Sequence, residues 1–211
     1  MYLIEGSIFM ALGMILYLVG RGILIGIRYK NNKQIYWLKE SIGFLFMLYI
    51  CMVVPLTLFP IPVGFAYDLG NNFHSLNLIP LKLIIDDISQ IGIAYGGDVP
   101  FMIRQIARNV GGNILLLMPL AFLAPILWDK FKSFRRILLL GFGVSISIEI
   151  VQFIGPTAAG WGRVTDIDDV ILNVLGVMIG YLIYKLTFKI VDTFQIGALQ
   201  KLNAGLIDNN N

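Results

Sequence analysis

The chain has 211 residues and is unusually apolar: 57% are hydrophobic, 14% are charged, and the mean hydropathy is +0.80. A water-soluble domain of this size could hardly bury so much apolar surface in one core, so most of the chain must face lipid or other membrane helices. The net charge of +3 is typical of basic residues that flank membrane helices and does not indicate nucleic-acid binding. Cys51 is the only cysteine, which excludes a disulfide framework and a cysteine-based metal site.

Five stretches are apolar enough to cross a membrane as helices, which takes about 20 residues each. They are Ser7 to Ile27, Ser41 to Pro60, Asn113 to Trp128, Phe134 to Ile154 and Val170 to Val191. The first lacks a basic segment before it and a small-residue cleavage site after it, so we expect it to be retained and not removed as a signal peptide. The third is short and carries Pro119 and Pro125, so neighbouring helices must satisfy the freed carbonyls.

The basic residues between the spans predict the orientation of the chain. Eleven of the 16 lie on one side, four lie on the other, and Arg21 lies inside the first span. Because Lys and Arg are retained on the cytoplasmic side, we expect the N-terminus outside and the C-terminus inside. The sequence therefore predicts a multi-pass protein of the cell membrane.

The external connection, residues 61–112, is too apolar for a solvated loop. Pro80 to Ile91 and Pro100 to Asn109 each mix apolar and charged residues at helical spacing, and Gly96 and Gly97 separate them. Such segments are typical of helices that lie in the membrane interface. The predicted fold is thus all-α, with about five transmembrane helices and external interfacial amphipathic helices. It divides into a first helix and cytoplasmic loop (1–40), a membrane domain (41–191) and a cytoplasmic tail (192–211).

Glu149 is the clearest candidate for a functional group inside the membrane. It lies five residues before the outer end of the fourth span, and Ser145 and Gln152 share its helix face. Charged side chains at this depth cost about 2.5 to 3.5 kcal/mol on insertion scales and are usually paired or functional. The alternative is a packing cluster of hydrogen bonds, or a neutral protonated Glu149.

A second group of polar residues opens the fifth span. Helical spacing places Asp166, Asp169 and Asn173 on one stripe, which continues through Gly176 and Gly180, small residues that let a neighbouring helix approach closely. The alternative is local, because Thr165 and Asp168 have the spacing of a capping box. Capping does not account for Asn173, one turn deeper.

Further candidates lie near the same end. Arg163 suits an ion pair with Asp166, a lipid phosphate or an anionic ligand. Asn109 and Asn113, with Arg108 beside them, enter the third span, and Asn77 precedes the first interfacial helix; helix-end hydrogen bonding is the alternative for these residues. His74 is the only histidine and is expected at a surface or interface, so we expect no metal centre and no cofactor.

Several of these segments together resemble the VanZ-like family of bacterial membrane proteins. The matching segments are Thr57 to Pro60, Asn77 to Pro80, Gly112 to Leu120, Glu149 to Phe153 and Arg163 to Gly176. The family often has an aromatic residue where this chain has Thr165, a departure that alters capping more than chemistry. The resemblance implies a role in the envelope of a Gram-positive-like cell, and the family name comes from reduced sensitivity to the glycopeptide antibiotic teicoplanin.

Two functions fit these residues. In the first, the protein binds or shields a lipid-linked envelope component at the outer leaflet, with Asn77, Asn113, Gln152, Arg163 and Asn173 as ligand-binding groups. In the second, it is an intramembrane enzyme that modifies a lipid or lipid-linked sugar, with Glu149, Asp166 and Asp169 as acid, base or cation ligands. We prefer the binding function, because the sequence contains no recognisable nucleophile for an enzyme. The sequence does not identify a protein partner. Either function predicts that these residues converge into one pocket.

Overall fold

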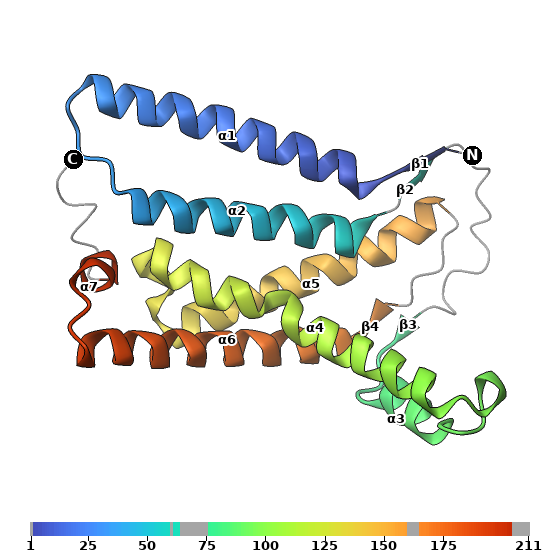
Figure 1. Cartoon of the computed structure of the whole chain (residues 1–211). Helices are drawn as coiled ribbons and strands as arrows, with labels where there is room; N and C mark the ends of the chain where they lie inside the picture. The colour runs from blue at the N-terminus through green and yellow to red at the C-terminus, as the bar shows by residue number, and fades with distance from the viewer. Residues whose placement is uncertain (1, 60, 64–75, 160–164, 204–211) are drawn as a thin grey trace.

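The computed structural model describes residues 2–59, 61–63, 76–159 and 165–203. Five long helices dominate it, as predicted, and each is long and apolar enough to span a membrane (Figure 1). They are α1 (Gly6–Lys30), α2 (Trp37–Leu58), α4 (Val99–Leu127), α5 (Phe134–Ala159) and α6 (Ile167–Thr193). The shortest, α2, has 22 residues, so at 1.5 Å per residue it extends about 33 Å, enough for a hydrocarbon layer of about 30 Å.

Short elements connect and cap this bundle. They are the helices α3 (Lys82–Ser89) and α7 (Gly197–Asn203), the 3-10 turns η2 (Tyr95–Gly97) and η3 (Asp129–Lys132), and the strands β1 (Tyr2–Ile4), β2 (Ile61–Val63), β3 (Leu76–Asn77) and β4 (Thr165–Asp166). The pair β1 and β2 is antiparallel, and β3 and β4 are parallel. The second pair matters most here, because it brings two segments almost ninety residues apart to the start of α6.

The third span differs from the sequence expectation. A short span from Asn113 and a separate amphipathic piece before it were predicted, whereas both belong to the single helix α4, 29 residues long. Asp98 caps its start, where the carboxylate accepts a hydrogen bond of 3.0 Å from Phe101 N, and Pro100 occupies the first turn. The polar residues in the first half of α4 lower its mean hydropathy, so this half was not predicted as part of the span. They do not interrupt the backbone hydrogen bonds of the helix. The first predicted piece is a separate helix, α3.

The helices α4 and α6 pack closest, through the predicted glycine stripe. A Cβ on Gly176 would lie 2.0 Å from the carbonyl oxygen of Ile114, and one on Gly180 would lie 2.1 Å from that of Met118. Only glycine allows this backbone approach, which is a common way for membrane helices to gain packing contacts. Beyond the glycines, Tyr181 and Tyr184 of α6 lie in the buried apolar core of the bundle.

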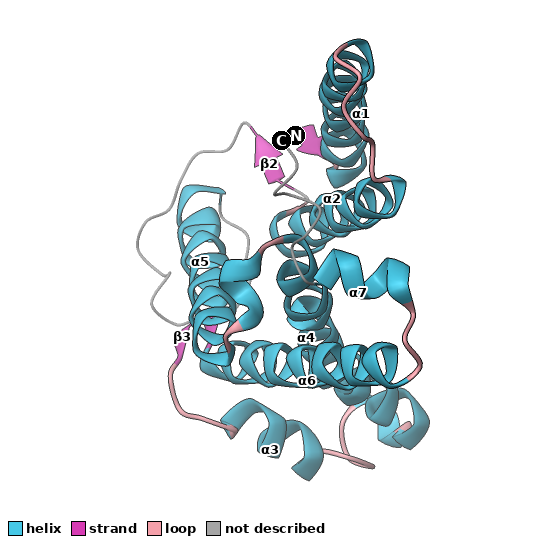
Figure 2. Cartoon of the chain, turned by 90° about the vertical axis from the view of Figure 1, so that its left-hand side faces the viewer, coloured by secondary structure: helices cyan, strands magenta, loops and turns pink. Residues whose placement is uncertain are grey.

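Helix α1 is attached to the outside of the bundle. Figure 2 shows it beside α2 and away from α4, α5 and α6, and none of its residues is buried. Gly6 lies against Pro55, where a Cβ would come within 2.4 Å, and Arg21 forms an ion pair with Glu40 that includes a 2.8 Å contact from Nη2 to Oε1. Most of the α1 surface is therefore apolar and open to lipid.

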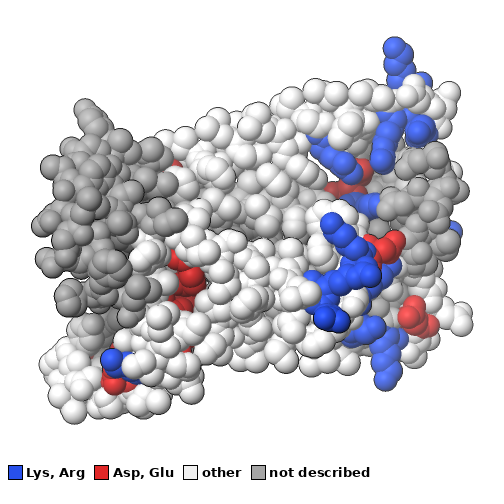
Figure 3. Space-filling view, turned by 180° about the vertical axis from the view of Figure 1, so that it is seen from behind, with Lys and Arg blue, Asp and Glu red and all other residues white. Residues whose placement is uncertain are grey.

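Charged residues divide unequally between the two ends of the bundle. Lys and Arg gather at the end formed by the last turns of α1 and α6, the first turns of α2 and α5, and η3 (Figure 3). At the opposite end the described basic residues are Lys82, Arg104 and Arg108. The asymmetry counted along the sequence is thus also an asymmetry in space.

Candidate functional site

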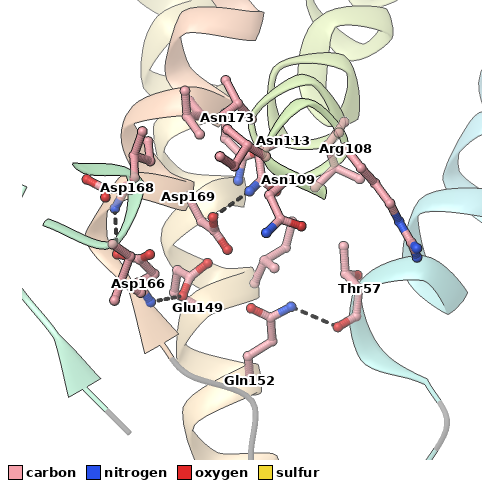
Figure 4. A pocket seen from close by; sticks show the side chains of 18 of the residues that line it. Thr57, Arg108, Asn109, Asn113, Glu149, Gln152, Asp166, Asp168, Asp169 and Asn173 are labelled. Carbon is pink, nitrogen blue, oxygen red and sulfur yellow. Dashed lines mark hydrogen bonds between the residues drawn. The ribbon is translucent and has the colours of Figure 1, made fainter. Parts of the chain in front are cut away.

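A cavity of about 600 Å³ opens at the end of the bundle that is poor in basic residues. Its walls come from α2, α3, α4, α5 and α6 (Figure 4). Leucine and isoleucine side chains form part of the wall, and the polar lining consists of Thr57, Asp87, Arg108, Asn109, Asn113, Glu149, Gln152, Asp166, Asp168, Asp169 and Asn173. The cavity therefore combines an apolar wall with a dense polar one.

Asp166 fixes the start of α6. It is the N-cap residue, and its Oδ1 accepts hydrogen bonds from Asp168 N at 3.0 Å and from Asn77 Nδ2 at 2.7 Å. The β3 and β4 pairing sets Asn77 directly opposite Asp166, which explains the second bond. The predicted capping box of Thr165 and Asp168 is wrong, because the helix begins one residue later and the cap is Asp166.

Glu149 joins α5 to the same point. Its side chain is only 6% exposed, and its Oε2 accepts a hydrogen bond of 3.1 Å from Asp166 N. A carboxylate at this depth is thus turned into the bundle and not toward lipid, in agreement with the cost of an unpaired charge in hydrocarbon. Figure 4 shows Glu149 beneath Asp169 and facing it across the cavity.

Three amide side chains bridge the helices around the cavity. Asn113 of α4 donates through Nδ2 to Asp169 Oδ1, and Asn173 of α6 donates through Nδ2 to Ser145 Oγ at 3.0 Å. Gln152 of α5 donates to the carbonyl oxygen of Thr57 in α2 at 2.9 Å. Neutral amide donors therefore connect every helix that borders the cavity except α3.

Asp168 ties α3 to α6. It is 1% exposed, and its Oδ1 accepts a hydrogen bond from the backbone N–H of Leu81, which has a positive φ of 63° just before α3 begins. This conformation is strained for leucine, so the carboxylate holds a turn that the chain would not otherwise prefer. The contact also positions Leu83, Ile84 and Asp87 along the cavity wall.

Two acceptors in this wall have no hydrogen-bond partner among the described residues. They are Oδ2 of Asp168 and Oδ1 of Asn173, and each residue is 1% exposed. A buried acceptor without a donor costs about 1 to 3 kcal/mol, so groups of this kind are uncommon unless they serve a ligand or bound water.

The charge of the described lining is strongly negative. Asp87, Glu149, Asp166, Asp168 and Asp169 contribute five carboxylates, and Arg108 is the single basic residue in the described lining. Arg108 forms no ion pair with any described residue, and Figure 4 shows its side chain pointing away from the carboxylates. Among the described residues no group of three or more His, Cys, Asp or Glu side chains is arranged to hold a metal ion.

The structure brings most of the predicted site residues together. Six of them line the cavity: Asn113, Glu149, Gln152, Asp166, Asp169 and Asn173. Asn77 contacts Asp166 from outside the cavity, and Arg163 and His74 lie outside the described residues. Their functional roles stay predictions.

Sequence reasoning underrated three residues. Arg108 and Asn109 were weighed as candidates with helix-end hydrogen bonding as the alternative and were not counted among the binding residues, yet both line the cavity with Asn113. Asp168 was assigned to local capping, although it reaches Leu81, 87 residues away in the sequence. No local pattern reports such a contact.

A second, apolar groove adjoins the cavity. It has a volume of about 480 Å³, lies between α2 and α5, and is lined by Leu58, Leu139, Leu140, Gly143, Val144, Ser147, Ile148 and Val151. Ile148 lines both spaces. The cavity and the groove therefore have one residue of α5 in common.

The fold and the cavity define a polytopic α-helical membrane protein with a polar site at one end of its bundle. A family model described as VanZ/LLP1 matches residues 46–189, and the chain belongs to this family. The matched region contains every residue that lines the cavity and leaves out α1. No curated protein and no solved structure matches the chain.

Proposed function

We propose that the protein binds a lipid or lipid-linked component of the cell envelope, with the polar head group in the cavity and the hydrocarbon chain along the α2 and α5 groove. The observation that carries the proposal is that a cavity of about 600 Å³ with many polar groups in its wall and an apolar groove of about 480 Å³ share the lining residue Ile148. An amphipathic ligand satisfies both surfaces at once, whereas a small polar solute would leave the groove without a role.

The proposed place of binding is the outer leaflet. The cavity lies at the end that is poor in Lys and Arg, and basic residues are retained on the cytoplasmic side of membrane proteins. This orientation places the N-terminus outside and residues 192–211 in the cytoplasm. A ligand held there would be less available to an antibiotic that is itself anchored in the outer leaflet, which is how we propose that binding contributes to teicoplanin tolerance.

The orientation is tested with topology reporters. A phosphatase active only outside the cell should be active when inserted near Gly96 and inactive when inserted near Lys132 or fused after Asn211. A matched cytoplasmic reporter should give the reverse pattern. An active phosphatase near Lys132, or an inactive one near Gly96, would contradict the orientation.

Ligand binding is tested by native mass spectrometry of protein extracted in a mild detergent. Wild-type protein should carry a copurified lipid, and Asp169→Asn should lose most of it, because the substitution removes a charge from the cavity wall. Asp192→Asn is the matched control, since Asp192 is exposed at the other end of the same helix. Equal lipid occupancy in all three proteins would contradict the proposal.

The same spectra address the second candidate, an enzyme that modifies a lipid or lipid-linked sugar. The observation that favours it is the convergence of Glu149, Asp166 and Asp169 on one cavity, an arrangement suited to acid and base catalysis. An enzyme should copurify with two lipids related by the gain or loss of one chemical group, and Glu149→Gln should collapse the pair to one. Binding alone predicts one unchanged lipid.

A further inference from the structure

We infer that Arg108 binds a phosphate group of the ligand in the exposed part of the cavity, so that the ligand is an anionic phospholipid. The inference rests on the proposed function and names the chemical class of its ligand. It adds Arg108 to the binding residues, with its neighbour Asn109 as a second donor of hydrogen bonds.

Four of the five carboxylates in the described cavity wall already accept hydrogen bonds from the protein. The donors are Asn77 and Asp168 N for Asp166, Leu81 N for Asp168, Asp166 N for Glu149, and Asn113 for Asp169. These bonds cap α6 or join it to α3, α4, α5 and β3. The four carboxylates therefore have a structural role that requires no ligand.

Arg108 and Asn109 of α4 are in a different situation. Both line the cavity and are exposed, and the side chain of neither forms a hydrogen bond or an ion pair with any described residue. Figure 4 shows Asn109 extending into the cavity and Arg108 pointing away from the carboxylates. A guanidinium and an amide nitrogen both donate hydrogen bonds, so together they suit an anionic acceptor.

The depth of Arg108 suits a lipid phosphate. It lies 19 residues before Leu127, the last residue of α4, and Trp128 and Lys130 follow at the end that is rich in basic residues. At 1.5 Å per residue this separation is about 28 Å, close to the hydrocarbon thickness of about 30 Å. The guanidinium of Arg108 therefore lies near the level of the phosphate groups in the leaflet at the cavity end.

The place of Arg108 in the cavity wall distinguishes a binding site from general contact with lipid. Arg104 lies one turn earlier on α4 and is also exposed, but it does not line the cavity. Arg108 is the single basic residue in the described lining, and a planar guanidinium can hold a phosphate through two parallel N–H bonds. A phospholipid in the cavity would therefore place its phosphate at Arg108.

The inference is tested with two lipids that share dioleoyl chains. Delipidated wild-type protein in an uncharged detergent is titrated with phosphatidylglycerol, which carries an anionic phosphate, and with diacylglycerol, which carries none. Bound lipid is counted by native mass spectrometry. Phosphatidylglycerol should bind about tenfold more tightly than diacylglycerol, which corresponds to about 1.4 kcal/mol.

Two matched variants locate this preference on α4. Arg108→Gln should reduce it to about twofold or less, because the substitution removes the charge and keeps a side chain of similar length. Arg104→Gln removes the same charge from the same helix outside the cavity and should keep the preference near tenfold. An equal reduction in the two variants would show that general electrostatic attraction causes the preference, and it would overturn the inference.

An excess of inorganic phosphate tests whether the phosphate belongs to a lipid. Bound phosphatidylglycerol should stay on the protein, because free phosphate cannot replace the contacts of the lipid chains. Its displacement would identify a site for soluble phosphate and would overturn the assignment to a lipid.

The wild-type titrations also separate this inference from the proposed function. Equal binding of phosphatidylglycerol and diacylglycerol would overturn the inference while leaving the proposed lipid binding in place. Binding of neither lipid above the level measured for Asp169→Asn would count against both. These comparisons need no substitution at Arg108, so they decide the question even if Arg108→Gln fails to fold.

Discussion

The helices α4 and α6 form two different contacts along their length. In one half the backbones nearly touch, with Gly180 against the carbonyl of Met118 and with tyrosines in an apolar core. In the other half Asn113, Asp169 and Asn173 border a cavity, and Asn113 of α4 donates a hydrogen bond to Asp169 of α6. Interhelical hydrogen bonds in membranes average only about 0.6 kcal/mol, so the close-packed half should supply most of the stability and the polar half the binding. Substitutions in the two halves should therefore have separable effects.

The largest effect is expected in the close-packed half. Gly180→Ala places a methyl group 2.1 Å from the carbonyl oxygen of Met118, so α4 and α6 must move apart. Overpacking of this kind costs about 1 to 3 kcal/mol or more, and both the midpoint of thermal unfolding and the amount of protein in the membrane should fall. Gly143→Ala is the control, because its added methyl meets open space. Equal stability of the two variants would refute the division of roles.

The next effect is expected in the polar half and concerns function with little loss of protein. Glu149→Gln keeps the volume of the side chain and an oxygen that can accept from Asp166 N, but it removes the charge. Asn173→Ala removes the bond to Ser145, a change of about 0.6 kcal/mol. Both variants should abolish any teicoplanin tolerance while membrane levels, measured by immunoblot, stay near those of the wild type. If both variants are lost from the membrane, or if both keep full teicoplanin tolerance, Glu149 and Asn173 have a structural role and not a functional one.

The five long helices could be predicted because hydropathy reports directly on spans that face lipid. The close approach at Gly176 and Gly180 was also predictable, since the two glycines lie one turn apart on the stripe that begins at Asp166. The continuity of α4 was missed because Arg104, Arg108 and Asn109 lower the local hydropathy without interrupting the helix.

The site was predictable in its residues more than in its connections. Polar residues in apolar spans stand out in a sequence, because placing such side chains in the hydrocarbon layer costs free energy. Glu149 and Asn173 were identified on this ground alone. The partners were not, because the bond from Asn77 to Asp166 joins residues 89 apart, and the bond from Leu81 to Asp168 depends on a strained turn. Such contacts arise only when the helices assemble.

The smallest effect is expected at Thr57, which lines the cavity from α2. Its hydroxyl donates to Val53 O in its own helix at 2.9 Å, and Gln152 binds its backbone carbonyl, which any residue would supply. Thr57→Val should therefore change the free energy of unfolding by only about 0.5 to 1.5 kcal/mol, the usual net value of one hydrogen bond, and should leave lipid occupancy unchanged. Loss of the bound lipid in this variant would show that the hydroxyl belongs to the site.

The claim that the cavity selects a lipid is tested most directly inside living membranes. Leu116 and Leu115 are neighbours on α4: the first lines the cavity, and the second is 58% exposed on the outer surface of the bundle. A photoreactive diazirine side chain at each position would label whatever lies beside it, and mass spectrometry would identify the adducts. One lipid class should dominate the adducts at Leu116, while the adducts at Leu115 should follow the bulk lipid composition. Identical adducts at the two positions would contradict the claim.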